Sequence, residues 1–277
     1  MEILSQWGSL ANLQRLGADT LDVENYRLWE RLKMANRLAV ITGGTKGLGK
    51  AVVERLLSEG FDVVITYGSD LERAVAVRAD LMAEFPGSQI NVLQADASDM
   101  ASIDVLKKFL IAEGRRLDVL ILNAGLTERG SFEEIAPESW ERVFRANVQV
   151  PVFTVQRLLD HFTESASVIF TGSLMGIEPH SMSLSYGATK ATVHALVKNL
   201  VKFLAPRGIR VNAVAPGFVD TEWQLTKPKE IRDRINSKIS LGRFATPEEI
   251  ADVYLTFIEN PYITGEILTI DGGYSYR

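Results

Sequence analysis

Short apolar, β-branched runs alternate with longer amphipathic stretches along the chain from Arg37 onward. The runs LAVIT, FDVVITY, INVLQA, LDVLILN, ASVIFTG, IRVNAVAP and GEILTID predict seven strands. Helices are predicted over 47–59, 70–85, 99–113, 137–163, 185–205 and 247–259. Nearly continuous apolar strands separated by helices are typical of a parallel sheet covered on both faces. The pattern therefore predicts a single α/β, doubly wound (Rossmann) domain over residues 37–277, whose ligands bind beyond the carboxyl ends of the strands.

Residues 1–36 follow another pattern. Leu and Trp recur at three- or four-residue steps from Ile3 to Leu16, the run breaks at Gly17, and apolar residues resume from Tyr26. The apolar runs are too short for a signal peptide or a membrane span. Two interpretations of this N-terminal extension stay open: an amphipathic helix that packs on the body or on a partner subunit, and a vector-derived leader.

Composition narrows the functional classes. A net charge of -5, without runs of Lys or Arg, argues against a nucleic-acid surface. The absence of cysteine excludes disulfides, thiolate metal sites and a Cys nucleophile, and it agrees with a cytoplasmic protein. His161, His180 and His194 lack the spacing of a zinc site, so we interpret them as surface or lightly buried residues and predict no metal.

The stretch ITGGTKGLGKA, which begins at Ile41, fits two phosphate-binding patterns. From Gly44 it matches the P-loop spacing, but the Ser or Thr that would hold Mg²⁺ is replaced by Ala51. From Thr42 it matches a dinucleotide turn, in which Gly43 permits the tight turn and Gly47 lets the backbone approach a pyrophosphate. Gly49 then lets the following helix pack close to the strand, and the dinucleotide interpretation is favoured.

Polar residues further along the chain suggest proton chemistry. Tyr186 and Lys190 are four residues apart and share one helix face, where an ammonium group lowers the pKa of a nearby phenol from its usual value of about 10. Ser173 and Asn123 follow predicted strands, so their side chains are expected at the carboxyl edge of the sheet. Asn147 lies within the predicted helix between them.

These ordered motifs resemble the short-chain dehydrogenase/reductase family, in its single-domain branch, over residues from about 37 to 273. The matching motifs are Thr42 to Gly49, Asp96-Ala97, Asn123 to Gly125, Asn147, Ser173, Tyr186 with Lys190, Pro216 to Thr221, and Asp271 to Gly273. Leu122 stands where many relatives have a second Asn, and Gly172 where many have a Ser.

The resemblance implies a hydride-transfer reaction between a carbonyl and a secondary alcohol. Tyr186 would be the general acid/base, and Ser173 would hydrogen-bond the substrate oxygen. Lys190 would lower the pKa of Tyr186 and hold the nicotinamide ribose, while Asn147 would position a water on the proton path.

The resemblance also implies the residues that contact the cofactor. Asp96 and Ala97 would lie beside the adenine, the Asn-Ala-Gly turn along the adenosine ribose, and Val219 and Thr221 at the carboxamide and pyrophosphate. The full predicted set is Gly43, Thr45, Lys46, Gly47, Leu48, Gly49, Tyr67, Asp96, Ala97, Asn123, Ala124, Gly125, Tyr186, Lys190, Pro216, Gly217, Val219 and Thr221.

NADP(H) is favoured over NAD(H) as the cofactor. NAD-specific relatives end the second strand with an acidic residue, whereas this chain has Tyr67 there, and Lys46 is placed to pair with a 2′-phosphate. Asp70 is the counter-evidence, because a longer second strand would bring its carboxylate near the ribose.

The substrate is less defined. Leu174, Met175, Met182, Trp223 and Leu225 suggest an apolar pocket under a lid over residues 218–244, and hence a mostly apolar small-molecule carbonyl or alcohol. A 3-oxoacyl-carrier-protein reductase is the alternative, and two other classes, a non-catalytic dinucleotide-binding regulator and a P-loop phosphotransferase, stay open. A homotetramer or homodimer that pairs the long helices is expected from the resemblance.

Overall fold

The computed structural model describes residues 36–179, 183–225 and 227–276. The pattern over residues 1–35, together with His180 and Met182, lies outside the described residues. Residues Arg37–Arg277 form one compact unit. Among the described residues, none of the helices combines the length and the apolar character that crossing a membrane requires.

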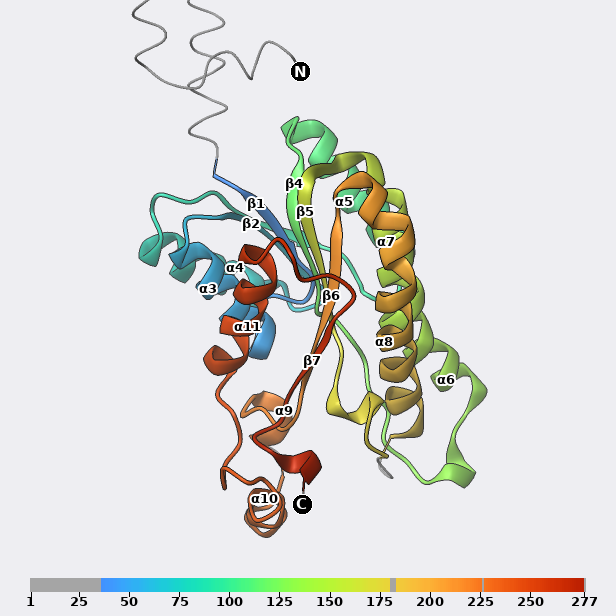
Figure 1. Ribbon diagram of the computed structural model, residues 1–277. Helices are drawn as coiled ribbons and strands as arrows, with labels where there is room; N and C mark the ends of the chain where they lie inside the picture. Colours follow the sequence, from blue (N-terminus) through green and yellow to red (C-terminus); the bar gives the residue numbers. More distant parts are fainter. Residues whose placement is uncertain (1–35, 180–182, 226, 277) are drawn as a thin grey trace, which may run out of the picture. The chain divides into compact units, whose positions relative to one another are not determined.

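The core of this unit is the predicted seven-stranded parallel sheet (Figure 1). Its strands are β1 (Leu38–Ile41), β2 (Asp62–Tyr67), β3 (Ile90–Gln94), β4 (Leu117–Leu122), β5 (Phe162–Thr171), β6 (Arg210–Pro216) and β7 (Ile267–Ile270). The spatial order is β3-β2-β1-β4-β5-β6-β7, so the winding reverses between β1 and β4. In doubly wound sheets this switch point is where a ligand crevice forms.

Helices cover both faces of the sheet (Figure 1). On one face lie α3 (Gly47–Ser58), α4 (Leu71–Glu84) and α11 (Pro247–Glu259). On the other lie α5 (Ser102–Glu113), α7 (Val150–Arg157) and α8 (Leu184–Leu204), with α6 (Pro137–Phe144) beside α8. Each layer has its own buried apolar cluster against the sheet. Since both faces of the strands are buried, polar side chains gather at the strand ends.

The predicted helix over 137–163 is wrong as a single element. The chain forms α6, a π turn over Arg145–Gln149, and then α7, which ends at Arg157. Pro151 explains the interruption, because it lacks the N–H that the carbonyl of Asn147 would accept in a regular α-helix. Strand β5 also begins at Phe162, before the apolar run that predicted it. Asn147 therefore lies in a π turn.

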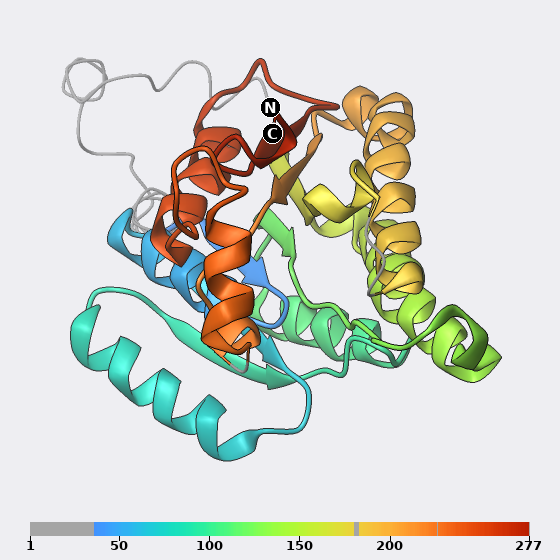
Figure 2. The ribbon, with the colours of Figure 1, turned by 90° about the horizontal axis from the view of Figure 1, so that it is seen from below.

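The segments that follow the strands gather at the carboxyl edge of the sheet. The lower end of Figure 1, seen face-on in Figure 2, holds α9 (Glu222–Leu225) and α10 (Lys229–Asn236), and the turn η6 (Leu174–Gly176) follows β5. Arg73 of α4 contacts both carboxylate oxygens of Glu222 at 2.6 and 2.9 Å, which ties α9 to the body. This edge is where the predicted site residues are expected.

The buried sheet gives a direct test of the fold. Ile121, in β4, is 0% exposed, whereas Ile111, in α5, is 60% exposed. We expect Ile121→Ala to lower the free energy of unfolding by about 3 kcal/mol, because it removes a packed side chain and leaves a cavity. The matched change Ile111→Ala is expected to stay within about 0.5 kcal/mol of wild type. Urea denaturation followed by circular dichroism measures both, and equal losses would contradict the assigned burial.

Candidate active site

Strand β5 and helix α8 bring the predicted hydroxyl pair together. Ser173 follows the end of β5, where its Oγ accepts a hydrogen bond from the backbone N–H of Met175 at 3.1 Å. Tyr186, in the first turn of α8, is hydrogen-bonded to the Ser173 side chain. The two hydroxyl groups therefore share one spot at the carboxyl edge of the sheet.

Lys190 lies one turn further along α8 and is 4% exposed. Its Nζ donates to the backbone carbonyl of Thr171, the last residue of β5, and lies 5.3 Å from the centre of the Tyr186 ring. Burial disfavours the charged ammonium and lowers the pKa of Lys190 to about 8. The lysine is thus held by a carbonyl beside the phenol.

The expected lowering of the pKa of Tyr186 is wrong for this arrangement. Burial in apolar surroundings raises the pKa of Tyr186 to about 12, and the hydrogen bond with Ser173 offsets this only in part. The charge of Lys190 is turned toward the carbonyl of Thr171, so desolvation of the phenolate dominates. At neutral pH Tyr186 holds its proton, which suits it to the role of a proton donor.

Asn147 is buried, and its side-chain amide forms hydrogen bonds with the backbone of the loop after β4. Its Oδ1 accepts from the N–H of Leu126 at 2.8 Å, and its Nδ2 donates to the carbonyl of Leu126 at 2.9 Å and to the hydroxyl of Thr189 at 3.0 Å. These bonds fix the loop after β4, in which a Cβ on Gly125 would approach Asn147 Oδ1 to 3.0 Å. The water-positioning role expected for Asn147 stays a prediction.

The glycine loop folds as the dinucleotide interpretation requires. Gly43 and Gly47 have φ angles of +66° and +52°, which L side chains rarely adopt. At Gly49 a Cβ would lie 2.4 Å from the carbonyl oxygen of Gly43, so only glycine lets α3 begin this close to the strand. The N-terminus of α3 has no side-chain cap from the described residues and no acidic residue in its first turn. Its backbone N–H groups and helix dipole therefore favour an anion such as a pyrophosphate.

The second lysine of the loop lies on the helix. Lys50 pairs with Glu54 one turn along α3, and Ala51 is buried, so neither residue is placed as in a P-loop. This arrangement removes the support for the phosphotransferase interpretation.

The turn after β2 decides the choice between the two nicotinamide cofactors. β2 ends at Tyr67, and Asp70 caps α4, where its carboxylate accepts from the backbone N–H of Arg73 at 3.0 Å. That hydrogen bond and the charges of Arg73 and Lys46 hold the pKa of Asp70 below its usual value. The carboxylate is engaged in capping, and the exposed Lys46 lies close enough to act on it. The glycine loop thus presents the cation Lys46 near this turn, and the carboxylate of the turn is already paired with Arg73.

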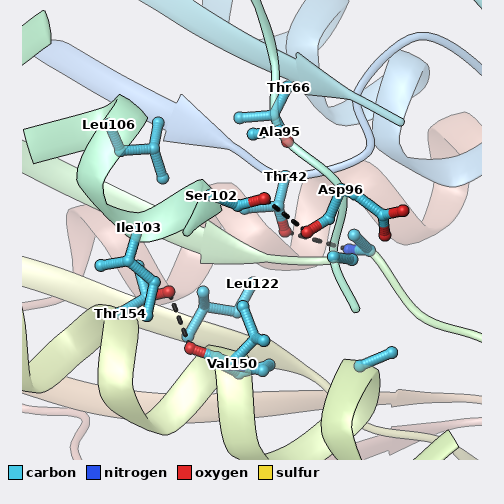
Figure 3. Close-up of a pocket in the computed structure, with 14 residues that line it drawn as sticks. Thr42, Thr66, Ala95, Asp96, Ser102, Ile103, Leu106, Leu122, Val150 and Thr154 are labelled. Atoms are coloured by element: carbon cyan, nitrogen blue, oxygen red, sulfur yellow. Dashed lines mark hydrogen bonds between the residues drawn. The ribbon is translucent and has the colours of Figure 1, made fainter. Parts of the chain in front are cut away.

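A pocket at the switch point contains the predicted adenine-side residues (Figure 3). Asp96, Ala97 and Ala124 line it, between the ends of β1, β3 and β4 and helices α5 and α7. Asp96 is locked in a turn, because its Oδ1 accepts from the N–H of Ser98 at 2.7 Å and its carbonyl accepts from the Ser102 hydroxyl at 2.6 Å. The three predicted residues therefore line one small hollow of about 20 Å³, which is room for a water molecule, and their contact with an adenine stays a prediction.

The remaining predicted cofactor residues lie on both sides of the glycine loop. Thr221 lies against it, since a Cβ on Gly47 would be 3.5 Å from the Thr221 Cβ. Val219 pairs with Ala245 in a short bridge, and Gly217, which follows Pro216 at the end of β6, donates its N–H to Ile270 at 2.8 Å. Thr45 is buried and Leu48 packs against the core, so their side chains serve the loop's own structure.

The apolar pocket predicted for the substrate stays a prediction. The Trp223 ring meets the Tyr186 ring edge-on at 6.2 Å, so α9 places an indole beside the ring of Tyr186. Leu174 is fully buried in the body, and Met175 packs on the apolar cluster formed by Phe218, Ile239 and Phe244. Met182 and the side chain of Leu225 lie outside the described residues.

His194 was missed by the sequence interpretation, which placed it at or near the surface. It is 8% exposed and lies one turn beyond Lys190 on α8, where its Nε2 accepts a long, 3.4 Å hydrogen bond from the N–H of Ser173. A Cβ on Gly172 would approach His194 Nε2 to 2.3 Å, so the missing side chain at Gly172 makes room for the imidazole. Its position four residues after Lys190 was the available signal.

The described residues fit a dinucleotide and offer no evident metal site. The glycine loop, the uncapped N-terminus of α3 and the pocket at the switch point all lie at the carboxyl edge of the sheet. Within residues 36–179, 183–225 and 227–276, no cluster of three or more His, Cys, Asp or Glu side chains is arranged to hold a metal ion.

Comparison with known proteins points to one family. A family model described as enoyl-(acyl carrier protein) reductase matches residues 43–275. The chain is 32% identical to the 3-oxoacyl-(acyl-carrier-protein) reductase of Aquifex aeolicus over 87% of this chain and 98% of that protein. It is also 32% identical to a diacetyl reductase, (S)-acetoin forming, of Staphylococcus epidermidis, over 87% of this chain and 100% of the relative.

Solved structures agree with these relatives. A short-chain dehydrogenase/reductase from Serratia marcescens superposes with a TM-score of 0.81 at 33% identity, covering 87% of this chain and 99% of the other. A short-chain dehydrogenase from Burkholderia cenocepacia in complex with NADP gives a TM-score of 0.81 at 31% identity, covering 87% and 98% of the two chains.

The buried imidazole predicts a pH dependence of stability. Burial, together with the charges of Lys190 and Lys198, lowers the pKa of His194 to about 4. Between that value and the usual pKa of about 6.5 the unfolded chain binds the extra proton, so stability falls as the pH drops through this window. We expect wild type to lose about 2 kcal/mol more than His194→Leu between pH 7 and pH 5, measured by urea denaturation.

A matched change at the other described histidine serves as the control. His161→Leu, at a half-buried site, is expected to keep the pH dependence of wild type. Parallel losses in His194→Leu and wild type would show that another group causes the acid destabilisation.

Proposed function

Because the chain belongs to the short-chain dehydrogenase/reductase family of oxidoreductases, we propose that it reduces the carbonyl of a mostly apolar ketone with NADPH, with Tyr186 as the proton donor. The observation that carries this proposal is the hydrogen bond between the Tyr186 hydroxyl and the Ser173 side chain, with Lys190 one turn away on the same helix. Two hydroxyl donors that converge on one point suit the oxygen of a carbonyl that becomes an alkoxide.

Tyr186 carries the proton that a ketone reduction consumes. With its pKa raised to about 12, Tyr186 is a neutral phenol at pH 7 and can give its proton to the developing alkoxide. Ser173 donates the second hydrogen bond to the same oxygen, while its own Oγ is held in place by the N–H of Met175. Lys190 offsets the charge left on the phenolate, since its ammonium lies 5.3 Å from the ring centre.

The proposed cofactor is NADP(H), and NAD(H) is expected to bind more weakly. When bound, the reduced nicotinamide supplies the hydride. The glycine loop and the N-terminus of α3 would hold the pyrophosphate, and Asp96, Ala97 and Ala124 would lie along the adenosine. Lys46 would pair with the 2′-phosphate. The NADP complex of the Burkholderia relative supports this choice, as does the engagement of Asp70 in capping α4.

Trp223 supports an apolar substrate. Its indole lies edge-on to the Tyr186 ring, so the body of a ketone held at the hydroxyl pair would contact an aromatic surface. A small ketone agrees with the diacetyl reductase relative, and a 3-oxoacyl thioester on a carrier protein agrees with the Aquifex relative. Assays of diacetyl, ethyl acetoacetate and a 3-oxoacyl-carrier protein, each with NADPH, separate these two substrate classes by their kcat/KM values.

Two further predictions stay open beside this function. Ser173, Tyr186 and Lys190 are all present and in contact, which speaks against a non-catalytic dinucleotide-binding regulator. The homotetramer or homodimer stays a prediction; the exposed ring of Phe203 on α8 agrees with a partner there.

Loss of the proton donor tests the mechanism. We expect Tyr186→Phe to lower kcat for ketone reduction roughly 100- to 10,000-fold, because the alkoxide then lacks its proton source. NADPH binding, measured by fluorescence titration, is expected to persist. Tyr262→Phe, at an almost fully exposed site, is the matched control and should keep wild-type turnover. Full activity of Tyr186→Phe would refute the assignment.

The cofactor preference rests on the charge of one lysine. Lys46→Ala is expected to weaken NADPH binding roughly tenfold, because a charge-assisted hydrogen bond to the 2′-phosphate is lost, and to leave NADH binding unchanged. Lys50→Ala removes the same charge four residues away, from a lysine paired with Glu54, and should change neither affinity. Isothermal titration calorimetry with NADPH and with NADH measures both affinities. If Lys46→Ala weakens the binding of NADPH and NADH equally, Lys46 does not act through the 2′-phosphate.

A further inference from the structure

Tyr254 carries a polar group deep into the core. This residue of α11 is 0% exposed and packs among the apolar side chains between α3, α11 and the sheet. Its hydroxyl lies 2.7 Å from the hydroxyl of Thr171, at the end of β5. An unpaired phenol in such surroundings costs about 1 to 3 kcal/mol, so this hydrogen bond is required where the tyrosine lies. Helix α11 covers the face of the sheet opposite to α8 (Figure 1), so Tyr254 contacts the end of β5 from the face that does not carry Tyr186 and Lys190.

The contacts of Thr171 continue from Tyr254 toward the glycine loop. The Thr171 hydroxyl donates to Asn123 Oδ1 in a long contact of 3.5 Å, and in the 2.7 Å hydrogen bond between Thr171 and Tyr254 either hydroxyl can be the donor. The Nδ2 of Asn123 gives its two protons to the carbonyls of Thr42 and Gly43, at 3.0 and 3.2 Å. The chain of hydrogen bonds thus runs from α11 through β5 and the end of β4 to the glycine loop.

Thr171 links this chain to the catalytic lysine. Its backbone carbonyl accepts a hydrogen bond from the ammonium of Lys190, while its hydroxyl is hydrogen-bonded to Tyr254. The next residue, Gly172, donates to the carbonyl of Val214 in β6 at 2.7 Å, and Ser173 follows. Holding the Thr171 side chain therefore restricts the orientation of the carbonyl that receives Lys190.

We propose that Tyr254 is a positioning residue of the active site: its hydroxyl, acting through Thr171, holds both the carbonyl that receives Lys190 and the amide that anchors the glycine loop. The kinetic consequence rests on the proposed ketone reduction, whereas the ordering of the glycine loop does not. Tyr254 touches neither substrate nor cofactor and acts through its neighbours.

Isosteric changes separate the hydroxyl groups from the packing. Tyr254→Phe and Thr171→Val each remove one hydroxyl and nearly keep the shape, and the double variant removes both. Thr171→Ser keeps the hydroxyl and serves as the rescue variant. Ser167→Ala is the matched control, because Ser167 bonds the carbonyl of Phe257 between the same strand and the same helix, away from the site.

The first readout is amide hydrogen exchange of residues 42–49 in the free protein. Tyr254→Phe and Thr171→Val are expected to accelerate this exchange about fivefold, as the loss of one net hydrogen bond in the chain implies. Ser167→Ala and Thr171→Ser are expected to leave it unchanged. The double variant should match the worse single variant, since both changes break the same chain.

The second readout is kinetic. In Tyr254→Phe, kcat with NADPH and a ketone is expected to fall about fivefold with an unchanged KM for the ketone. The pH at which Lys190 titrates in the kcat profile should move lower, because its ammonium loses part of its acceptor. Thr171→Ser, which keeps the hydroxyl that Thr171→Val removes, should keep both wild-type values.

The two proposals fail in different ways. Lack of ketone turnover in wild type overturns the proposed function, while faster exchange of residues 42–49 in Tyr254→Phe still supports the positioning role. If Tyr254→Phe lowers only the free energy of unfolding, as Ser167→Ala does, with unchanged exchange, kcat and pH profile, then Tyr254 is a core residue and the positioning role is refuted. Additive effects of Tyr254→Phe and Thr171→Val would refute it as well.

Discussion

The contact between helix α8 and the end of strand β5 is the constraint on which the site depends. Tyr186 and Lys190 share a face of α8, and that face lies against a strand end where Thr171 offers a carbonyl and Ser173 a hydroxyl. A shift of α8 by one residue would turn both side chains away from β5. The buried apolar cluster between α8 and the sheet holds this register, so the fold and the chemistry depend on the same packing.

Burial shifts the pKa values of Tyr186 and Lys190 in opposite directions. The phenol of Tyr186 keeps its proton because the phenolate is poorly solvated, and the ammonium of Lys190 has its pKa lowered for the same reason. The carbonyl of Thr171 accepts a hydrogen bond from the Lys190 ammonium, so its dipole favours the charged form of the lysine. The electrostatics of the site are therefore set as much by backbone orientation as by charged side chains.

The seven strands and the carboxyl-edge location of Ser173 and Asn123 could be predicted, because β-branched runs and the residues that follow them are local signals. The π turn at Asn147 could not, since it depends on how one missing N–H at Pro151 is accommodated within a packed helix. The pKa of Tyr186 was predicted in the wrong direction, because spacing shows that Lys190 is near but not which way its ammonium turns. His194 and Tyr254 were missed because burial of a polar side chain is a tertiary property, set by residues far away in the chain.

The close approach of His194 to Gly172 also couples the effects of amino-acid substitutions at positions 172 and 194. A side chain at position 172 meets the imidazole at once, whereas loss of the imidazole leaves a space and an amide of Ser173 without its acceptor. Replacements at the two positions are therefore expected to be non-additive, because each changes the space or the hydrogen bond that the other residue uses. The effect of a substitution at position 172 thus depends on which residue stands at position 194.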